Sequence, residues 1–139
     1  MLVKVFGAAV QGIDATLITI EVNSSRGCMF YLVGLPDSAV KESYQRIRSA
    51  IQVNGYKMPT SSITINMAPA DIRKEGSALD LAIAIAILKN MGIIRKRNLD
   101  DYIFIGELHL DGKINPVNGI LSMCIEAKKM KIKNMHLNN

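Results

Sequence analysis

Hydrophobic and polar residues alternate along the early part of the chain, which is typical of strands that bury one face. The alternation covers residues 2–7, 15–23 and 28–34. A turn-forming SSRG sequence at residues 24–27 joins the second stretch to the third. The pattern therefore predicts that these two stretches pair as a hairpin whose loop contains glycine.

A helical period follows the third stretch. Apolar side chains recur every three or four residues from Val40 to Ile51 and predict a helix. Pro36 and Asp37 mark its entry, and Asn54-Gly55 is expected to end it. Asp37 or Ser38 is expected to cap its first turn.

The remaining pattern predicts strands and helices in alternation. Strands are expected at residues 62–67, 102–108 and 113–117, helices at 77–90 and 119–131, and the start of a further strand within 134–139. The order predicts an α/β (α+β) fold, a two-layer mixed sheet with helices. At 139 residues the whole chain, 1–139, is expected to be a single domain.

The sequence RKEGSALDLAIAIAILKN at residues 73–90 places a serine before an almost unbroken apolar run. Asp80 stands three residues after Ser77, so the two residues predict a capping box at the start of the helix. The run from Leu79 to Leu88 has no polar face, so either its own domain or a partner must cover the helix on several sides.

The sequence shows no segment suited to membrane insertion or secretion. The apolar run is too short to cross a bilayer, and the N-terminus lacks the layout of a secretory signal, so a soluble cytoplasmic protein is expected.

The formal net charge is +5, with basic residues gathered at 93–98 and 126–134. This charge is compatible with nucleic-acid binding, with a solvated helix face as the alternative. No aromatic residue lies within the second cluster, so base stacking there is not specifically indicated.

Recognisable motifs for metal or phosphate chemistry are absent from the sequence. There is no G-x-x-x-x-G-K-[ST] and no G-x-G-x-x-G sequence. Cys28 and Cys124 form no CxxC pair and are expected to be free, buried thiols, with a disulfide left open. Ser77 could act as a nucleophile only beside a base. His109 is expected on an exposed strand edge and His136 at the surface.

Four long stretches carry a family resemblance. They cover residues 5–22, 30–51, 63–88 and 104–121, and they include VGLPDSAVKES, PADIRKEGSALDL and GELHLDG. Together they resemble the N-terminal domain of the magnesium-chelatase-like AAA+ ATPases, the family of ComM and YifB. The resemblance covers nearly the whole chain. It implies a fold similar to the Lon protease domain and to the second domain of a small-subunit ribosomal protein.

The resemblance also implies a larger protein. In this family the domain precedes an AAA+ core, which is expected to bind ATP and Mg and to assemble with neighbouring subunits as a hexamer. The ComM branch is associated with branch migration of recombining DNA in natural transformation. This chain would then be a piece of such a protein, with no cofactor of its own and no membrane partner.

The similarity to Lon allows the role of Ser77 to be tested. Lon-like peptidases keep their serine at the start of a helix, where Ser77 stands, and a lysine base after a Gly-Gly-Leu sequence. The matching sequence here is NGIL, residues 118–121, in which Leu121 occupies the lysine position. Leucine cannot accept a proton, so the resemblance implies a non-catalytic module. A Lon-like serine peptidase that uses Ser77 with an unconventional base is the alternative.

The leading expectation is a non-catalytic module that supports oligomer assembly or DNA binding. Its candidate DNA contacts are the basic residues Arg73, Lys74, Lys128, Lys129, Lys131 and Lys133.

Overall fold

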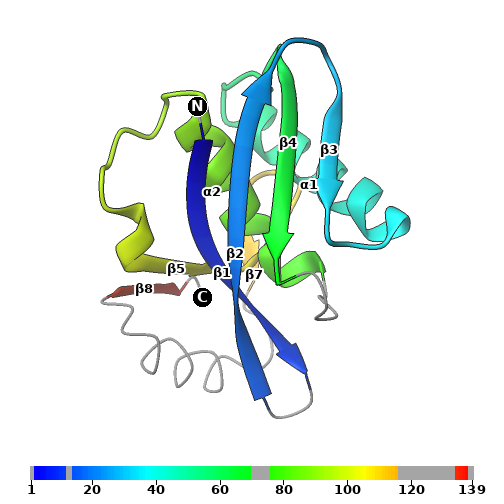
Figure 1. Cartoon of the computed structure of the whole chain (residues 1–139). Coiled ribbons are helices and arrows are strands. Elements are labelled where there is room, and N and C mark those ends of the chain that lie inside the picture. Colours follow the sequence, from blue (N-terminus) through cyan, green and yellow to red (C-terminus); the bar gives the residue numbers. More distant parts are fainter. Residues whose placement is uncertain (1, 12–13, 70–75, 116–133, 138–139) are drawn as a thin grey trace.

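A mixed six-stranded sheet organises the molecule, with strand order β3-β4-β2-β1-β5-β8 (Figure 1). The computed structural model describes residues 2–11, 14–69, 76–115 and 134–137. The strands of this sheet are β1 (Leu2–Gln11), β2 (Asp14–Ser25), β3 (Phe30–Val33), β4 (Ser62–Ala68), β5 (Tyr102–Ile105) and β8 (Asn134–Leu137). A separate two-stranded sheet pairs β6 (Glu107–Leu108) with β7 (Ile114–Asn115). The helices are α1 (Asp37–Val53) and α2 (Asp80–Asn90), with short 3-10 turns η1 (Gly76–Leu79) and η2 (Leu99–Asp101). The predicted mixed sheet with helices is confirmed.

The strand pairing differs from the prediction at β3. β1 and β2 form the antiparallel hairpin, while β4 lies between β2 and β3, antiparallel to the first and parallel to the second. The predicted hairpin of β2 with β3 is therefore wrong. β4 buries Ile63, Ile65 and Met67 and needs neighbours on both sides, whereas short β3 buries only Leu32 and suits a sheet edge.

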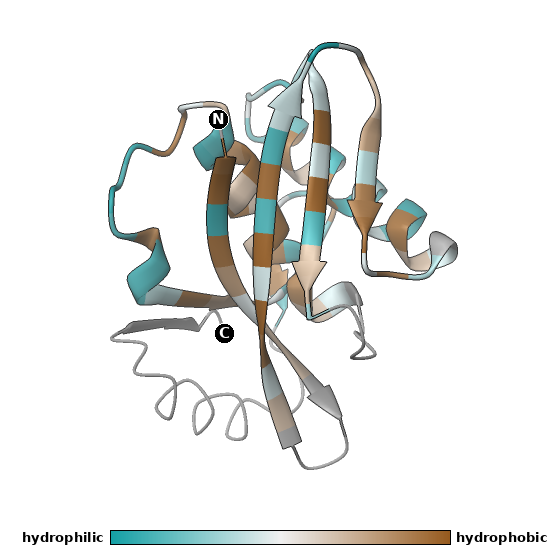
Figure 2. Ribbon diagram, in the orientation of Figure 1, coloured by the Kyte–Doolittle hydropathy of each residue, from teal (hydrophilic) through white to brown (hydrophobic). Residues whose placement is uncertain are grey.

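Alternate residues of the central strands face the helices and form the core. Val3 and Val5 of β1 and Ile18 and Ile20 of β2 are buried. Figure 2 shows the resulting alternation of hydrophobic and hydrophilic bands along β2 and β4. The strands predicted at residues 2–7, 15–23 and 62–67 thus follow from a period of two in which one face is buried.

The structure answers what covers the apolar helix. Within α2, buried residues run from Asp80 to Ala84 and include Ala86 and Ile87, and α2 packs against β1, β2, β5 and α1. Gly7 of β1 permits this close approach, because a Cβ atom there would lie 2.8 Å from Cδ2 of Leu79 in η1 and 3.4 Å from Cβ of Ala82 in α2. The strands and α1 of this chain therefore bury the apolar surface of α2, and no partner is needed to bury it.

The predicted strand at 102–108 is two strands separated by Gly106. The Gly106 amide donates to the carbonyl of Ala78 (3.2 Å), and its carbonyl accepts from the Leu81 amide (3.1 Å). This backbone is paired with η1 and α2, so the sheet ladder stops there and β6 turns into a hairpin with β7. The predicted turn at Asp111-Gly112 is confirmed, with Gly112 at φ +93°.

The ends of α1 and the exposure of Cys28 can also be compared with the prediction. α1 ends at Asn54-Gly55 as predicted, but Pro36 stands at its N-cap and makes no side-chain cap, so the predicted Asp37 or Ser38 cap is wrong. Asp37 already lies inside the helix, because Pro36 supplies the extended conformation before it. Cys28 is exposed rather than buried, since it lies in the turn between β2 and β3. Cys124 and the helix predicted at 119–131 lie outside the described residues.

Among the residues that the structure describes, no helix has both the length and the apolar character needed to cross a membrane.

Candidate functional site

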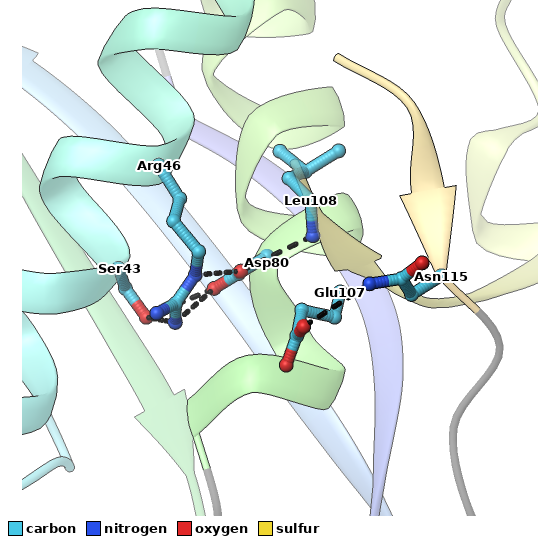
Figure 3. A network of polar contacts seen from close by, with 6 residues as sticks. All are labelled: Ser43, Arg46, Asp80, Glu107, Leu108 and Asn115. Atoms are coloured by element: carbon cyan, nitrogen blue, oxygen red, sulfur yellow. Dashed lines mark hydrogen bonds and ion pairs between the residues drawn. The ribbon is translucent and has the colours of Figure 1, made fainter. Parts of the chain in front are cut away.

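The most concentrated polar chemistry in the described structure surrounds Asp80, at the start of α2 (Figure 3). Its carboxylate is fully buried and accepts from Ser43 Oγ to Oδ1 (2.9 Å) and from Arg46 Nε to Oδ2 (2.5 Å). Arg46 Nη2 also donates to Oδ1 (3.2 Å), and the Leu108 amide donates to Oδ2 (3.3 Å). The carboxylate thus joins α1, α2 and β6.

Helical spacing places both α1 donors together. Ser43 and Arg46 stand three residues apart, so they lie on one face of α1. Arg46 Nη2 also donates to Ser43 Oγ (3.2 Å), which fixes the hydroxyl between the two charged groups. The hydrogen bond to Asp80 raises the pKa of Arg46, and burial raises the pKa of the Asp80 carboxyl against the opposing effect of its donors.

This arrangement stabilises the fold and is not set up for catalysis. Each oxygen of Asp80 already accepts from two donors, and no buried side-chain nitrogen or oxygen in the described residues lacks a partner. A carboxylate held in this way is a poor general base and a poor metal ligand, because its lone pairs are engaged. Asp80 therefore fastens the start of α2 to α1 and to the β6–β7 hairpin.

The predicted capping box is wrong. α2 begins at Asp80 with Leu79 at the N-cap position, and no side chain caps it. Ser77 lies one turn earlier, in η1. Asp80 cannot bond back to the Ser77 amide because its oxygens are used by Arg46, Ser43 and Leu108, which offer a stronger, charge-assisted set of donors.

Ser77 itself is half-buried at the edge of this site. Within the described ranges, no hydrogen bond joins the Ser77 hydroxyl to a histidine, lysine or carboxylate. The position that resembles the Lon base, Leu121, lies outside the described residues. The assignment of Ser77 as non-catalytic therefore stays a prediction.

His109 is exposed, as expected, and it lies at the end of a polar chain on the β6–β7 hairpin. The Nε2 atom of His109 is 2.5 Å from Oδ1 of Asn115, and Asn115 Nδ2 donates to Glu107 Oε1 (3.3 Å). An amide oxygen can only accept, so Nε2 carries the proton in this arrangement. This series of hydrogen bonds connects β6 to β7, and the Nε2 atom of His109 is occupied by its contact with Asn115.

The predicted DNA contacts lie outside the described part of the chain. Arg73 and Lys74 fall within residues 70–75, and the four lysines from Lys128 to Lys133 fall within residues 116–133, all outside the described residues.

Comparison with known proteins sets the context for this site. Residues 20–138 match the protein family described as subunit ChlI of Mg-chelatase. The chain belongs to this family. Among its relatives, YifB of Escherichia coli is 46% identical over 122 residues, which is 87% of this chain and 24% of YifB. The competence protein ComM of Haemophilus influenzae is 42% identical over 128 residues, 91% of this chain and 25% of ComM.

The match covers one part of these larger ChlI-family relatives. An uncharacterized protein of Mycobacterium tuberculosis is 36% identical over 127 residues, and again the chain corresponds to 25% of its length. The chain thus spans about a quarter of the length of the curated relatives it matches. The resemblance to the ComM and YifB family is confirmed.

The Arg46–Asp80 pair was missed by the sequence reasoning, although the sequence carries a signal for it. Asp80 is the acidic residue inside an otherwise apolar run, and a buried carboxylate requires a cationic partner. The partner's position, on the preceding helix, depends on how α1 packs against α2 and has no local signature.

Proposed function

We propose that this ChlI-family chain is a non-catalytic module of a larger magnesium-chelatase-like AAA+ ATPase, in which it supports subunit assembly and DNA binding. The observation that carries the proposal is the 42% sequence identity to ComM, a protein named for competence, in an alignment that covers 91% of this chain. The process served would be recombination, with branch migration in natural transformation as the activity of the complete protein. The expected compartment is the cytoplasm.

The chemistry of the described residues supports a non-catalytic role. The buried carboxylate has all its acceptor positions occupied, and Ser77 has no basic partner in the described part of the chain. A site for the triphosphate and Mg of ATP hydrolysis has no support among the described residues. The sequence has no P-loop, and within the described ranges no group of three His, Cys, Asp or Glu side chains could hold a metal ion. These cofactors would bind the AAA+ core, and the partners of this module would be that core and the neighbouring subunits of a hexamer.

DNA binding is tested most directly with the six candidate cations. Fluorescence anisotropy of a labelled branched DNA is measured with this chain at two salt concentrations. Binding is expected to weaken steeply as salt rises, because phosphate contacts release counterions. Changing Arg73, Lys74, Lys128, Lys129, Lys131 and Lys133 to Gln should abolish binding and its salt dependence.

The matched control changes six cations that are exposed in the described structure to Gln: Arg26, Lys41, Arg48, Lys57, Arg95 and Lys113. It removes the same amount of charge and should retain most of the affinity. Absence of binding by the unmodified chain, or equal loss in both variants, would show that the candidate residues do not form a DNA contact.

A further inference from the structure

Two adjoining hollows lie where β1 begins and α2 ends. The larger has a volume of about 240 Å³ and is lined by Lys4, Lys89, Arg97 and Leu99, among others. The smaller, about 190 Å³, is lined by Lys96, Leu99, Tyr102 and Phe104. Leu99 lines both hollows, and Lys96 and Arg97 are consecutive in the chain, so the two spaces share a wall. We call them the basic hollow and the aromatic hollow.

The basic hollow collects cations from three separate elements. Lys89 lies in the last turn of α2 and Arg97 in the segment that follows α2, while Asp100 is the acidic residue of the lining. Lys4 of β1 also lines the hollow, and its Nζ lies 5.5 Å from the centroid of the Phe6 ring. Lys89 Nζ donates to the carbonyl of Lys96, which leaves the other ammonium protons available. The lining therefore carries a net positive charge and includes a guanidinium, the group best suited to two-point contact with phosphate.

The aromatic hollow has a different character. The rings of Tyr102 and Phe104 are stacked, with centroids 6.0 Å apart and planes inclined by 23°. Lys96 Nζ donates to Tyr102 Oη (2.5 Å) and lies 4.5 Å from the centroid of the same ring. Phe104 is 7% exposed and packs into the core, so the half-buried Tyr102 ring beside the Lys96 ammonium is the surface on which a planar base can stack, with little dependence on which base is present.

We propose that the two hollows together bind one nucleotide unit, with its phosphate in the basic hollow and its base in the aromatic hollow. An acidic peptide would use the cations but would leave the aromatic hollow unfilled, so the paired character favours a nucleotide. The unit could be a free nucleotide or part of a single-stranded nucleic acid. The proposal is independent of the DNA contact attributed above to residues 73–74 and 128–133.

Binding is tested with AMP, ribose 5-phosphate and a single-stranded oligothymidylate, by calorimetry for the small ligands and anisotropy for the oligonucleotide. The double variant Lys4→Gln/Arg97→Gln should weaken AMP binding about tenfold or more, and each lost phosphate contact should reduce the salt slope by about 1 for the oligonucleotide. The control Lys41→Gln/Arg48→Gln removes the same charge from exposed positions on α1 and should leave both nearly unchanged.

Two further variants separate site binding from general attraction to a basic protein. Asp100→Asn removes the opposing carboxylate and should tighten binding. Tyr102→Leu should lower the affinity for AMP to that for ribose 5-phosphate, which has no base to stack. A Tyr102→Leu variant that binds AMP as well as the unmodified chain would overturn the placement of the base.

The remaining outcomes are decisive. Equal weakening by Lys4→Gln/Arg97→Gln and by its control would refute the basic hollow, as would absence of binding to both AMP and the oligonucleotide. Binding of AMP without the oligonucleotide supports the hollows and identifies a free nucleotide as the source. Loss of branched-DNA binding in the six-residue variant, with AMP binding intact, would show that the two sites are distinct.

Discussion

Two elements, α1 and β6, direct hydrogen bonds to the carboxylate of Asp80 on α2. The side chain of Asp80 is fully buried and that of Arg46 is 23% exposed. Removing one partner of such a pair leaves a charge buried without compensation, which costs far more than the pair itself contributes.

Arg46→Met is therefore expected to lower the free energy of unfolding by about 3 kcal/mol, at the low end of the range for buried pairs because Arg46 is partly exposed. Urea denaturation measures this change. Arg48→Met, on an exposed position of the same helix, should change stability by less than about 0.5 kcal/mol. Similar effects of the two substitutions would show that the Arg46–Asp80 pair does not hold α1 against α2.

In the double variant Arg46→Met/Asp80→Asn, the loss of unfolding free energy should be smaller than the sum of the losses in the two single variants, because the residues share one interaction.

Ser77→Ala distinguishes the two interpretations of the opening of α2. A capping serine would cost about 1 kcal/mol on replacement, but Ser77 lies in η1 and does not cap α2, so a loss below about 0.5 kcal/mol is expected. Incubation of the unmodified chain with a fluorophosphonate probe should give no labelling. Labelling that disappears in Ser77→Ala would instead support the peptidase alternative.

Single residues show how far the sequence could lead. The positions of Gly55 and Gly112 were predictable, because a positive φ favours glycine and leaves a local mark in the sequence. The role of Asp80 was not, since Ser77 and Asp80 fit a capping box locally. The competing donors come from residues 28 to 37 positions away along the chain.

At the scale of elements, α2 is the apolar helix at the centre of the core. Ile83 has no exposed surface, whereas Ile93, just after the helix, is 37% exposed. Ile83→Ala is expected to cost about 2–5 kcal/mol, because it removes buried methyl groups and leaves a cavity. Ile93→Ala makes the same chemical change and should cost less than about 1 kcal/mol.

Thermal or urea unfolding of this chain alone provides the measurement. A small effect at Ile83 would mean that α2 is not covered by the chain's own sheet and that a partner must supply the cover. The large effect expected follows from the packing of α2 on β1 and β2.

The positions of the strands and helices along the sequence were largely predictable, but the order in which the strands pair in the sheet was not. Alternation in β1, β2 and β4 is a local property that reports one buried face, so their approximate extents could be predicted. The insertion of β4 between β2 and β3 depends on which strand buries more apolar side chains on the finished sheet. That preference exists only after residues far apart in sequence have been brought together.

At the scale of the molecule, the mixed sheet with helices was predicted from the order of elements, and the ChlI-family match confirms the family that the motifs resemble. The candidate site was less accessible. The fully satisfied network at Asp80 and the two hollows at Leu99 both join segments that are distant in the chain. The residue types in each of them are common in proteins. The packing of α2 against its neighbours brings the residues of the network together at one end of the helix and those of the hollows together at the other.

The position of β1 in the sheet has a consequence for protein synthesis. β1 is translated before both of its neighbours in the sheet, β2 and β5, and Phe6 lies opposite Ile103 in a parallel pairing. The hairpin with β2 can form as soon as that strand leaves the ribosome, but the other edge of β1 must wait until β5 has been made. Throughout that interval the nascent chain carries an open backbone edge on a strand meant for the interior, the kind of edge that recruits chaperones or other nascent chains. Slower translation of residues 26–101 would prolong that exposure, so yield of folded protein should depend on codon usage in this region more than in residues 2–25.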